Sequence, residues 1–466
     1  MTGLAMLDAD SLWGTVLAAA AGSHDQPART VARLCHSAGS PRLGWVRPAP
    51  WRVVRRAVSA VRSALGAPQT VLLGTGGWSF AAQALCETVG GTSRLVPLDS
   101  LDCAAIQAVL DPGPARRQGF LAVSGSGTTL ETCRLADVVA AGCARRLVWL
   151  QDGTAPPATY ALSAHGTRDH VAMLGAPLSM AFLVAADAVD GAALAAVYPR
   201  LLRRYRRLGA SAARRAVAVA VSGDVRVGFT VPRWAGPGLR RWLLQLGRQV
   251  LCGKSDRFRA SVEVYGFGER RGHTDAHVDF GTLRRGLAQL MDLFYVAGVF
   301  VACVGLRAGI EVAEHPHVHA YKDLLAQADP DRVPARPVAA EDLPALAAAW
   351  LAPRTDLDTL HVVRYWSAAP PAALDAGRFC AATGRRCEVH EGSAWNHHSF
   401  QAVYADPRVG VLLVTRPPGA EGRTPATLAT AERTLSQITV ATHRALPDRS
   451  LLARLVTAAG PGTGGG

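Results

Sequence analysis

The chain has almost no lysine and no closely paired cysteines, and both shortages narrow what it can be. Its basic side chains are nearly all arginine, with Lys254 and Lys322 the two lysines among 466 residues. The nine cysteines are scattered without a C-x-x-C pair, and no zinc-finger or recognition-helix pattern accompanies them. An odd number of scattered cysteines is typical of a reducing compartment, so we expect a cytoplasmic protein.

A positively charged leader and a long apolar run are also missing. The N-terminus, MTGLAMLDAD, carries two aspartates where a secretory signal would carry positive charge. The longest apolar run, LFYVAGVFVACVGL, has 14 residues, short of the roughly 20 that span a bilayer. We therefore expect no membrane partner and interpret this run as a buried helix.

The composition is that of a globular protein with an excess of positive charge. With 49% hydrophobic and 18% charged residues, the chain is long enough for two or three domains. The formal net charge of +14 favours anionic partners, either nucleic acid or phosphorylated metabolites. The densest basic run, YPRLLRRYRRLGASAARR, spreads its arginines around much of one helix. We interpret it as a solvated helix and regard nucleic acid as an unlikely partner.

Short apolar strands alternate with amphipathic helices, which is typical of an α/β protein with parallel, doubly wound sheets. The first strands are TVLLGTGG, SRLVPLDS, QGFLAVSG and RRLVWLQD, and LHVVRYWS, RRCEVHEG and VGVLLVT supply later ones. We predict a helical N-terminal arm over residues 1–50, a first α/β domain over 51–215, a second over 216–455 and a flexible tail over 456–466.

Two glycine-rich segments stand where parallel sheets bind ligands, at the carboxyl ends of predicted strands. In LAVSGSGTTLETC, hydroxyl side chains crowd between glycines, and a helix beginning at TTLE would present free backbone N–H groups. Such a loop is a phosphate site, although a serine-threonine turn that caps a helix has the same composition. The second segment, GTGGWS, is not a dinucleotide fingerprint, because Ser79 stands at its third glycine position. The predicted phosphate ligands are Ser124, Ser126, Thr128 and Thr129.

Six segments in order resemble the phosphoglucose isomerase family, and most closely the isomerase module of bifunctional transaldolase/phosphoglucose isomerases. They are LLGTGGWSFAAQAL, LDSLDCAAIQAVL, SGSGTTLE, WLLQLGRQVLCGK, EHPHVHAYK and GSAWNHHSFQAVYADPRVGVLLVT, within residues 68–416. The resemblance implies two flavodoxin-like sugar-isomerase (SIS) domains, each a parallel sheet flanked by helices. It also implies a homodimer and a 6-phosphosugar substrate, and we expect no cofactor.

The resemblance also assigns roles to residues. Lys322 and His397 match the lysine and histidine that open the sugar ring, with His398 the alternative to His397. The hydroxyl residues of the SGSGTTLE loop match the family's phosphate ligands. The matched positions of the substrate loops are Gly76, Gly77, Ser79 and Gln401.

Four positions depart from the family pattern. Val250 stands at the glutamate that moves the proton between C1 and C2, and Leu174 stands at the arginine that stabilises the enediolate. Trp78 replaces a serine in the first glycine loop, and Gly125 replaces a lysine in the phosphate loop. Ordinary isomerase chemistry therefore needs a base from elsewhere in the fold. The carboxylates that could supply one are Glu263, Glu269 and Glu391.

Histidines cluster in two further segments, GHTDAH and EHPHVHAYK. Alternate histidines of an extended segment share a face, which suits metal ligation, although hydrogen-bonded or exposed polar histidines give the same pattern. The speculative metal ligands are His315, His317 and His319. Three hypotheses follow: a sugar-phosphate isomerase with a relocated base, a biosynthetic enzyme that uses the histidine-rich site, and a non-catalytic sugar-phosphate-binding protein. The sequence favours the first.

Overall fold

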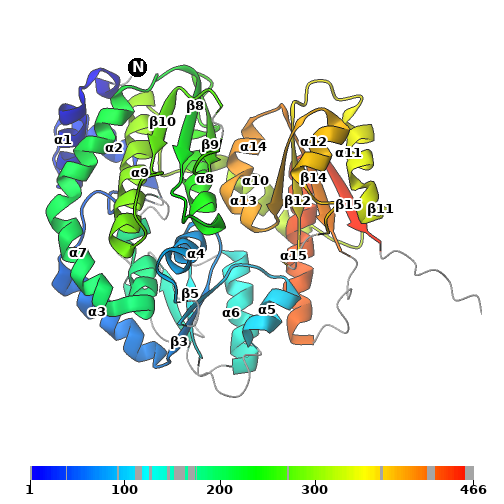
Figure 1. Ribbon diagram of the computed structural model, residues 1–466, viewed down its shortest axis with the longest axis horizontal. Coiled ribbons are helices and arrows are strands. Elements are labelled where there is room, and N and C mark those ends of the chain that lie inside the picture. The colour runs from blue at the N-terminus through cyan, green and yellow to red at the C-terminus, as the bar shows by residue number, and fades with distance from the viewer. Residues whose placement is uncertain are drawn as a thin grey trace, which may run out of the picture. The chain divides into compact units, whose positions relative to one another are not determined.

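The chain has the α/β fold predicted from its sequence, with parallel sheets flanked by helices (Figure 1). It divides into two compact units: Met1–Asp99, Val109–Pro316 and His397–Ala402 form the first, and Ser100–Ala108, His317–Asn396 and Val403–Gly466 form the second. The computed structural model describes residues 3–37, 39–91, 94–110, 118–124, 129–143, 147–151, 163–165, 174, 176–269, 272–367, 371–416 and 426–456.

The first sheet of the first unit contains the four strands expected from the N-terminal half. Its five parallel strands follow the order β4-β3-β5-β6-β7. Their bounds are β3 Gln69–Leu73, β4 Leu95–Leu98, β5 Gln118–Val123, β6 Leu147–Gln151 and β7 Ser163–His165. The helices that follow β3, β4 and β5 are α4 Gly77–Val89, α5 Cys103–Leu110 and α6 Leu130–Cys143. Val71, Leu72 and Leu73 are fully buried, as continuous apolar strands of a parallel sheet must be.

The order of these strands creates a switch point between β3 and β5. The chain leaves β3 for β4 on one side and leaves β5 for β6 on the other. In open α/β sheets the crevice outside the carboxyl ends at such a point is where ligands bind. The two strand ends approach closely there, because a Cβ on Gly74 would lie 3.0 Å from the carbonyl oxygen of Val123. The strand ends that precede the two glycine-rich segments therefore meet at the switch point.

A second, three-stranded parallel sheet of the first unit has the order β10-β8-β9. Its strands are β8 Gly223–Thr230, β9 Phe258–Tyr265 and β10 Ala276–Asp279, and its long helices are α7 Met180–Val217, α8 Pro237–Leu251 and α9 Leu287–Ala308. Both α7 and α9 are long and apolar enough to cross a membrane by length and composition alone. The apolar window of α9 is 78% buried inside the protein. As predicted, this apolar run is the central helix of a protein core.

The N-terminal residues, expected to form an arm, belong to the first unit. Asp8 caps α1 by accepting from Ser11 N–H, and Asp25 caps α2 by accepting from Ala28 N–H. Helix α1 packs against α7 so tightly that a Cβ on Gly209 would lie 2.1 Å from Trp13 Cζ2. The elements here are η1 Gly3–Met6, α1 Ala9–Ala20, α2 Gln26–Leu34, β1 His36–Ser37, β2 Ser40–Pro41, α3 Trp51–Leu65 and η2 Ala176–Leu178.

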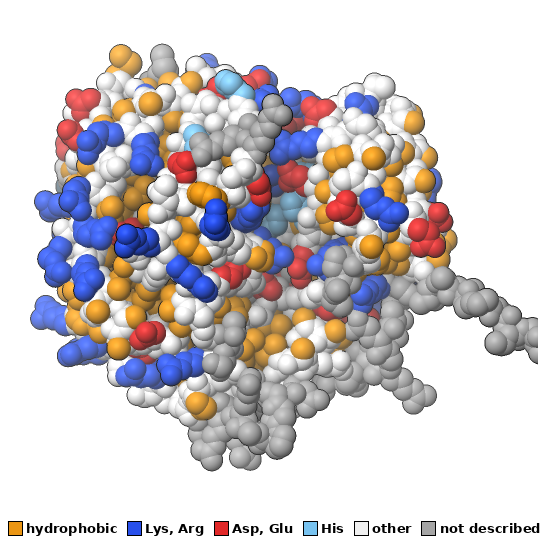
Figure 2. All heavy atoms as spheres, in the orientation of Figure 1, with side chains coloured by type: hydrophobic (Ala, Val, Ile, Leu, Met, Phe, Trp, Pro, Cys, Tyr) orange, Lys and Arg blue, Asp and Glu red, His pale blue; other side chains and the backbone are white. Residues whose placement is uncertain are grey.

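The arginine-rich run forms the second half of α7 and is mostly solvated, as predicted. Figure 2 shows basic side chains gathered over α3 and α7 on the left of the view. One arginine of this run, Arg204, pairs with Asp292 of α9. The exposed arginines of α7 are Arg200, Arg203, Arg206, Arg207, Arg214 and Arg215.

The second unit is built on a five-stranded parallel sheet with the order β11-β15-β14-β12-β13. Its strands are β11 Arg336–Val338, β12 Thr359–Arg364, β13 Arg386–Glu391, β14 Val409–Thr415 and β15 Ser450–Leu455. The later strands expected from the sequence are β12, β13 and β14. Residues 216–455, predicted as one domain, are thus divided between the two units.

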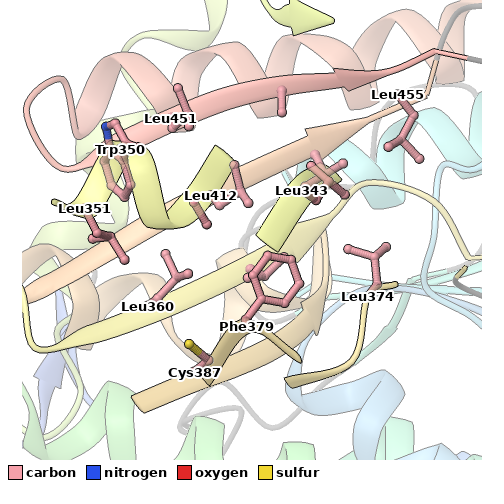
Figure 3. Close-up of a cluster of buried hydrophobic side chains, with 14 of the residues drawn as sticks. Leu343, Trp350, Leu351, Leu360, Leu374, Phe379, Cys387, Leu412, Leu451 and Leu455 are labelled. Atoms are coloured by element: carbon pink, nitrogen blue, oxygen red, sulfur yellow. The ribbon is translucent and has the colours of Figure 1, made fainter. Parts of the chain in front are cut away.

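One face of this sheet carries the hydrophobic core of the second unit. Figure 3 shows Leu360, Leu412 and Leu451 of three strands meeting Phe379 of α12 and Trp350 of α11. Helix α15 packs on the strands β14 and β15. The helices of this unit are α10 His319–Lys322, η4 Leu325–Gln327, η5 Ala340–Asp342, α11 Leu343–Leu351, α12 Ala376–Thr383 and α15 Ala426–Ala445. Three further helices, η3 Pro316–Val318, α13 Ala394–His398 and α14 Phe400–Ala405, are divided between the two units.

Candidate functional site

Two of the four predicted phosphate ligands are described, and they lie together at the switch point. Ser124 follows β5 directly, and Thr129 precedes α6. Their hydroxyl oxygens are 2.9 Å apart, and the Thr129 N–H donates to Ser124 Oγ at 3.4 Å. Two hydroxyl groups thus stand at the N-terminus of a 14-residue helix, which favours an anion. Ser126 and Thr128 lie outside the described residues, as does Gly125.

The first glycine loop lies against His397, which together with His398 forms the histidine segment of the first unit. Gly76 has a φ of 72°, and a Cβ there would lie 3.1 Å from Gln245 Nε2 and 3.2 Å from His397 Cβ. Glycine is therefore needed both for the backbone conformation and for the close approach. Within the described part of the chain, the buried hydroxyl of neighbouring Thr75 has no hydrogen-bond partner. A buried orphan hydroxyl at a switch point indicates a place that a ligand or water completes.

The most informative contact in this unit joins His397 to Glu131. His397 Nε2 lies 2.9 Å from Glu131 Oε1, and only 11% and 4% of the two side chains are exposed. Glu131 stands in the first turn of α6, immediately after the phosphate loop. Sequence reasoning missed it, although the acidic residue that ends SGSGTTLE was a visible signal. The structure therefore places a carboxylate–imidazole pair beside the predicted phosphate site.

This contact sets the protonation pattern of the imidazole. A carboxylate accepts a hydrogen bond, so Nε2 of His397 carries the proton that points at Glu131. The lone pair of the neutral ring then lies on Nδ1, which makes no hydrogen bond within the described part of the chain. An imidazole oriented by a buried carboxylate can take up a proton on Nδ1, because the carboxylate stabilises the resulting cation.

Polar side chains of α8 hold the backbone and neighbours of His397 in place. Gln249 Nε2 donates to the carbonyl oxygen of His397, and Arg248 donates to Ser399 Oγ. Ser399 Oγ also lies 2.6 Å from His398 Nδ1, and Gln245 Nε2 donates to Gln249 Oε1. Residues 245, 248 and 249 share one stripe of the helix, because they are three and four positions apart. Sequence reasoning missed these three residues, although polar side chains at this helical spacing in an apolar segment were a visible signal.

Other predicted substrate-loop residues are engaged within the first unit. Ser79 is fully buried in the first turns of α4 and accepts from Gln83 Nε2 at 3.4 Å. Gln401 donates to the carbonyl oxygen of Cys252 at 3.3 Å. Gly77 opens α4, and the neighbouring Trp78 is buried.

The two replaced catalytic positions are occupied by core side chains. Val250 is fully buried and Leu174 is 2% exposed. The carbonyl oxygen of Leu174 comes so near α9 that a Cβ on Gly298 would lie 2.9 Å from it. Neither residue can exchange protons or carry charge, so acid–base chemistry in this unit must use other groups.

The three carboxylates considered as substitutes for the missing base have partners of their own. Glu263 accepts from the Tyr265 hydroxyl, and Glu391 of the second unit lies 3.7 Å from Arg364 Nη2. Glu269 accepts from Gly266 N–H and from Arg240, and the backbone hydrogen bond lowers the pKa of Glu269. Glu131, which was not among them, is the carboxylate that contacts His397.

The remaining predicted site residues belong partly to the second unit. Lys322 ends the short helix α10 and is exposed. His315 Nδ1 lies 3.2 Å from the carbonyl oxygen of Gln249 in the first unit, whereas His317 packs on Tyr404 in the second. His319 opens α10. His315 and His317 thus make their contacts in two different units.

In the described part of the chain, the side chains spaced closely enough to share a metal ion are His361, Glu388 and His390, outside the predicted histidine clusters. Their ligand-type atoms lie within 4.8 Å of one another on β12 and β13. Trp395 Nε1–H donates to His361 Nδ1 at 2.9 Å, so a neutral His361 carries its proton on Nε2, toward Glu388. A metal-bound histidine instead donates from its second nitrogen to an acceptor. We therefore interpret this group as a hydrogen-bonded network, to which Arg386 adds a bond to Glu388.

Lys254, the last residue of the segment WLLQLGRQVLCGK, carries a pH-dependent part of the stability. Burial lowers the pKa of its ammonium to about 7, and Cys252, Glu314 and Glu311 offset part of that effect. Nζ donates to the carbonyl oxygen of Glu311 at 2.7 Å. The unfolded chain binds this proton up to about pH 10, so stability attributable to Lys254 increases as the pH rises from about 7 to about 10.

We expect Lys254→Met to remove this increase. Urea unfolding at about pH 7 and about pH 9 should show the wild type gaining about 1 kcal/mol that the variant does not gain. Solvent reaches the half-buried Lys254 side chain and screens part of the cost of burying its charge, which limits the gain to this size. The exposed Lys322→Met is the matched control and should keep the wild-type slope. An equal slope in Lys254→Met would contradict the prediction.

Comparisons with known proteins agree with the fold. No protein-family model and no curated protein matches the sequence. A hypothetical protein from Thermus thermophilus is similar in structure, with a TM-score of 0.52 and 17% identity over 64% of this chain and 93% of that one. A glucose-6-phosphate isomerase from Chlamydia trachomatis gives a TM-score of 0.47 and 13% identity over 68% and 85% of the two chains. The first likeness shows a shared α/β fold.

Proposed function

We propose that the chain binds a sugar phosphate at the switch point of its first sheet and interconverts the aldose and ketose forms, with His397 as the acid–base residue. The observation that carries this proposal is the 2.9 Å contact between His397 and Glu131, the residue that follows the phosphate loop. Proton transfer on a phosphorylated substrate needs an acid–base group and an anion site close together, and a buried imidazole oriented by a carboxylate can be that acid–base group.

The phosphate group is held by the loop that precedes α6. Ser124 and Thr129 supply hydroxyl groups there, and the helix N-terminus supplies backbone N–H groups. The proposal keeps Ser126 and Thr128 as further phosphate ligands. Anchoring one end of the substrate leaves its carbonyl end to meet His397.

The isomerisation itself is a proton transfer without net oxidation. His397 Nδ1 takes the proton from C2 of the aldose, an enediolate forms, and the same nitrogen returns a proton to C1. A second proton moves from the C2 hydroxyl to the oxygen on C1, so atoms and electrons balance within the substrate. Glu131 stabilises the imidazolium that exists between the two steps. This arrangement replaces the glutamate whose position Val250 occupies.

A positive charge beside the developing enediolate is the second requirement, because Leu174 cannot supply one. Arg248 is the buried guanidinium tied to the same segment, through its hydrogen bond to Ser399. We assign it the electrostatic role. Lys322 retains the ring-opening role that the phosphoglucose isomerase resemblance implies, and a homodimer in the cytoplasm remains part of the proposal.

The experiment is NMR of glucose 6-phosphate and fructose 6-phosphate incubated with the pure protein in D₂O. We expect deuterium to enter at C1 of fructose 6-phosphate and at C2 of glucose 6-phosphate, and no label to enter unphosphorylated fructose. Saturable binding of both sugar phosphates without exchange would support the non-catalytic alternative for these substrates. Absence of both binding and exchange would reject hexose phosphates as ligands.

A further inference from the structure

A cavity of about 240 Å³ is formed entirely by residues of the second unit. It opens at the carboxyl ends of two neighbouring parallel strands: Thr415 is the last residue of β14, Arg454 is the next-to-last of β15, and both line the cavity. Carboxyl ends of parallel strands are where α/β sheets place their ligands. None of the residues in the proposed isomerase chemistry lines this cavity.

Side-chain alternation along β15 explains why a charged residue faces the cavity. Leu451 and Leu455 point into the hydrophobic cluster shown in Figure 3, so Leu452 and Arg454 point to the opposite face of the sheet. Thr415 is paired in register with Arg454 and therefore shares that face. Helix α15 packs over β14 and β15 and contributes residues of one stripe. Those that line the cavity are Ala429, Glu432, Arg433, Ser436, Thr439 and Val440.

The charges that line the cavity favour an anion. Arg416, Arg433 and Arg454 approach it from three different elements, and Asp331 and Glu432 are its carboxylates, which leaves one net positive charge. Arg416 is held with its guanidinium 4.9 Å from the centre of the Trp366 ring. A planar guanidinium group can donate two parallel hydrogen bonds to two oxygens of one phosphate. Several arginines around one cavity therefore favour phosphate binding.

We propose that this cavity binds a small phosphorylated molecule that also carries hydroxyl groups. The arginines take the phosphate, and the hydroxyl of Ser436 adds a donor, whereas the Thr439 hydroxyl donates to the carbonyl oxygen of Leu435. Asp331 and Glu432 accept hydrogen bonds from ligand hydroxyls, which an unsubstituted phosphate ion does not offer. The volume suits a ligand of monosaccharide size, because pockets for larger ligands begin at roughly 300 Å³. The proposal goes beyond isomerisation, since it gives the five-stranded sheet of the second unit a binding site of its own.

Calorimetric titration of the full chain tests it, with fructose 6-phosphate, inorganic phosphate and fructose as probes. We expect two equivalents of fructose 6-phosphate to bind to the wild type and one to an R433Q/R454Q variant. Removing an arginine–phosphate contact weakens binding roughly ten-fold or more, so R433Q alone should raise one of the two dissociation constants by that factor. Arg433 is exposed on α15, which makes this single change tolerable for folding.

A variant with R378Q and R385Q removes the same charge outside the cavity and should keep both equivalents. One equivalent in the wild type, with R433Q and R433Q/R454Q unchanged, would overturn the proposal. Equal affinity of the cavity for inorganic phosphate and fructose 6-phosphate would overturn the role given to ligand hydroxyls. The first-unit site is tested separately by the S124A/T129V variant. If this variant titrates like the wild type while R433Q/R454Q loses one equivalent, the isomerase site is rejected and the cavity is supported.

Discussion

Replacing His397 with alanine should lower the rate of deuterium exchange into fructose 6-phosphate roughly 10²–10⁴-fold, because general acid–base catalysis contributes that much. The reason is geometric: the imidazole is the one proton-transferring ring held by Glu131, at 2.9 Å, next to the phosphate loop. Binding of the sugar phosphate should change far less, since Ser124 and Thr129 remain. The measurement is single-turnover exchange by NMR together with a calorimetric dissociation constant.

Two further variants separate His397 from its surroundings. Glu131→Gln keeps a hydrogen-bond acceptor for Nε2–H but removes the charge that stabilises imidazolium, so a loss of roughly ten-fold to a hundred-fold is expected. His398→Gln removes the neighbouring ring, whose Nδ1 contacts Ser399, and should cost less than ten-fold. A larger loss in His398→Gln than in His397→Ala would transfer the acid–base role to His398. Exchange that survives all three changes would remove the histidine segment from the mechanism.

Seven strands of the two five-stranded sheets could be predicted, because each is a short apolar run with clear turn signals. The strands β7, β11 and β15 were not predicted, and β7 and β11 are only three residues long. TVLLGTGG and QGFLAVSG indicated both the strands and the glycine-rich ends that meet at the switch point. The resemblance to phosphoglucose isomerases pointed to His397, although that residue stands 266 positions from Glu131. No pattern in a single sequence pairs residues so far apart, because their contact depends on how the chain folds between them.

The arginines show a second limit of sequence reasoning. Their abundance suggested anionic partners, yet several serve as caps for buried or partly buried carbonyl groups. Arg285 donates to the carbonyl oxygens of Thr88 and Glu87 near the end of α4, and Arg307 donates to those of Ala216 and Val219 at the end of α7. An unpaired carbonyl at a helix end is costly, and a forked guanidinium satisfies two at once. Net charge therefore overstates how much of the basic character is open to ligands.

Arg449 is the extreme case and gives the largest expected effect on stability. It stands one residue before β15 and donates to the carbonyl oxygens of Val403, Tyr404, Asp406 and Val409. Val403 and Tyr404 lie in the last turn of α14, Asp406 lies in the turn that follows, and Val409 is the first residue of β14. Burial lowers the pKa of the Arg449 guanidinium, but the group stays charged because guanidinium is the weakest acid among the cationic side chains. One side chain thus ties the end of a helix to the start of two neighbouring strands.

Arg449→Met should lower the free energy of unfolding by about 3 kcal/mol, since four carbonyl groups lose a charged donor while partial exposure lets water replace some of the bonds. Arg449→Lys should recover part of the loss, because an ammonium cannot span all four acceptors. Arg444→Met, which removes an exposed arginine bonded to one carbonyl of Gln327, is the control and should cost under about 1 kcal/mol. Hydrogen exchange followed by mass spectrometry should place the loss in β14 and β15. If β14 and β15 of Arg449→Met are as protected from hydrogen exchange as they are in the wild type, the carbonyl groups find other donors and the cap is dispensable.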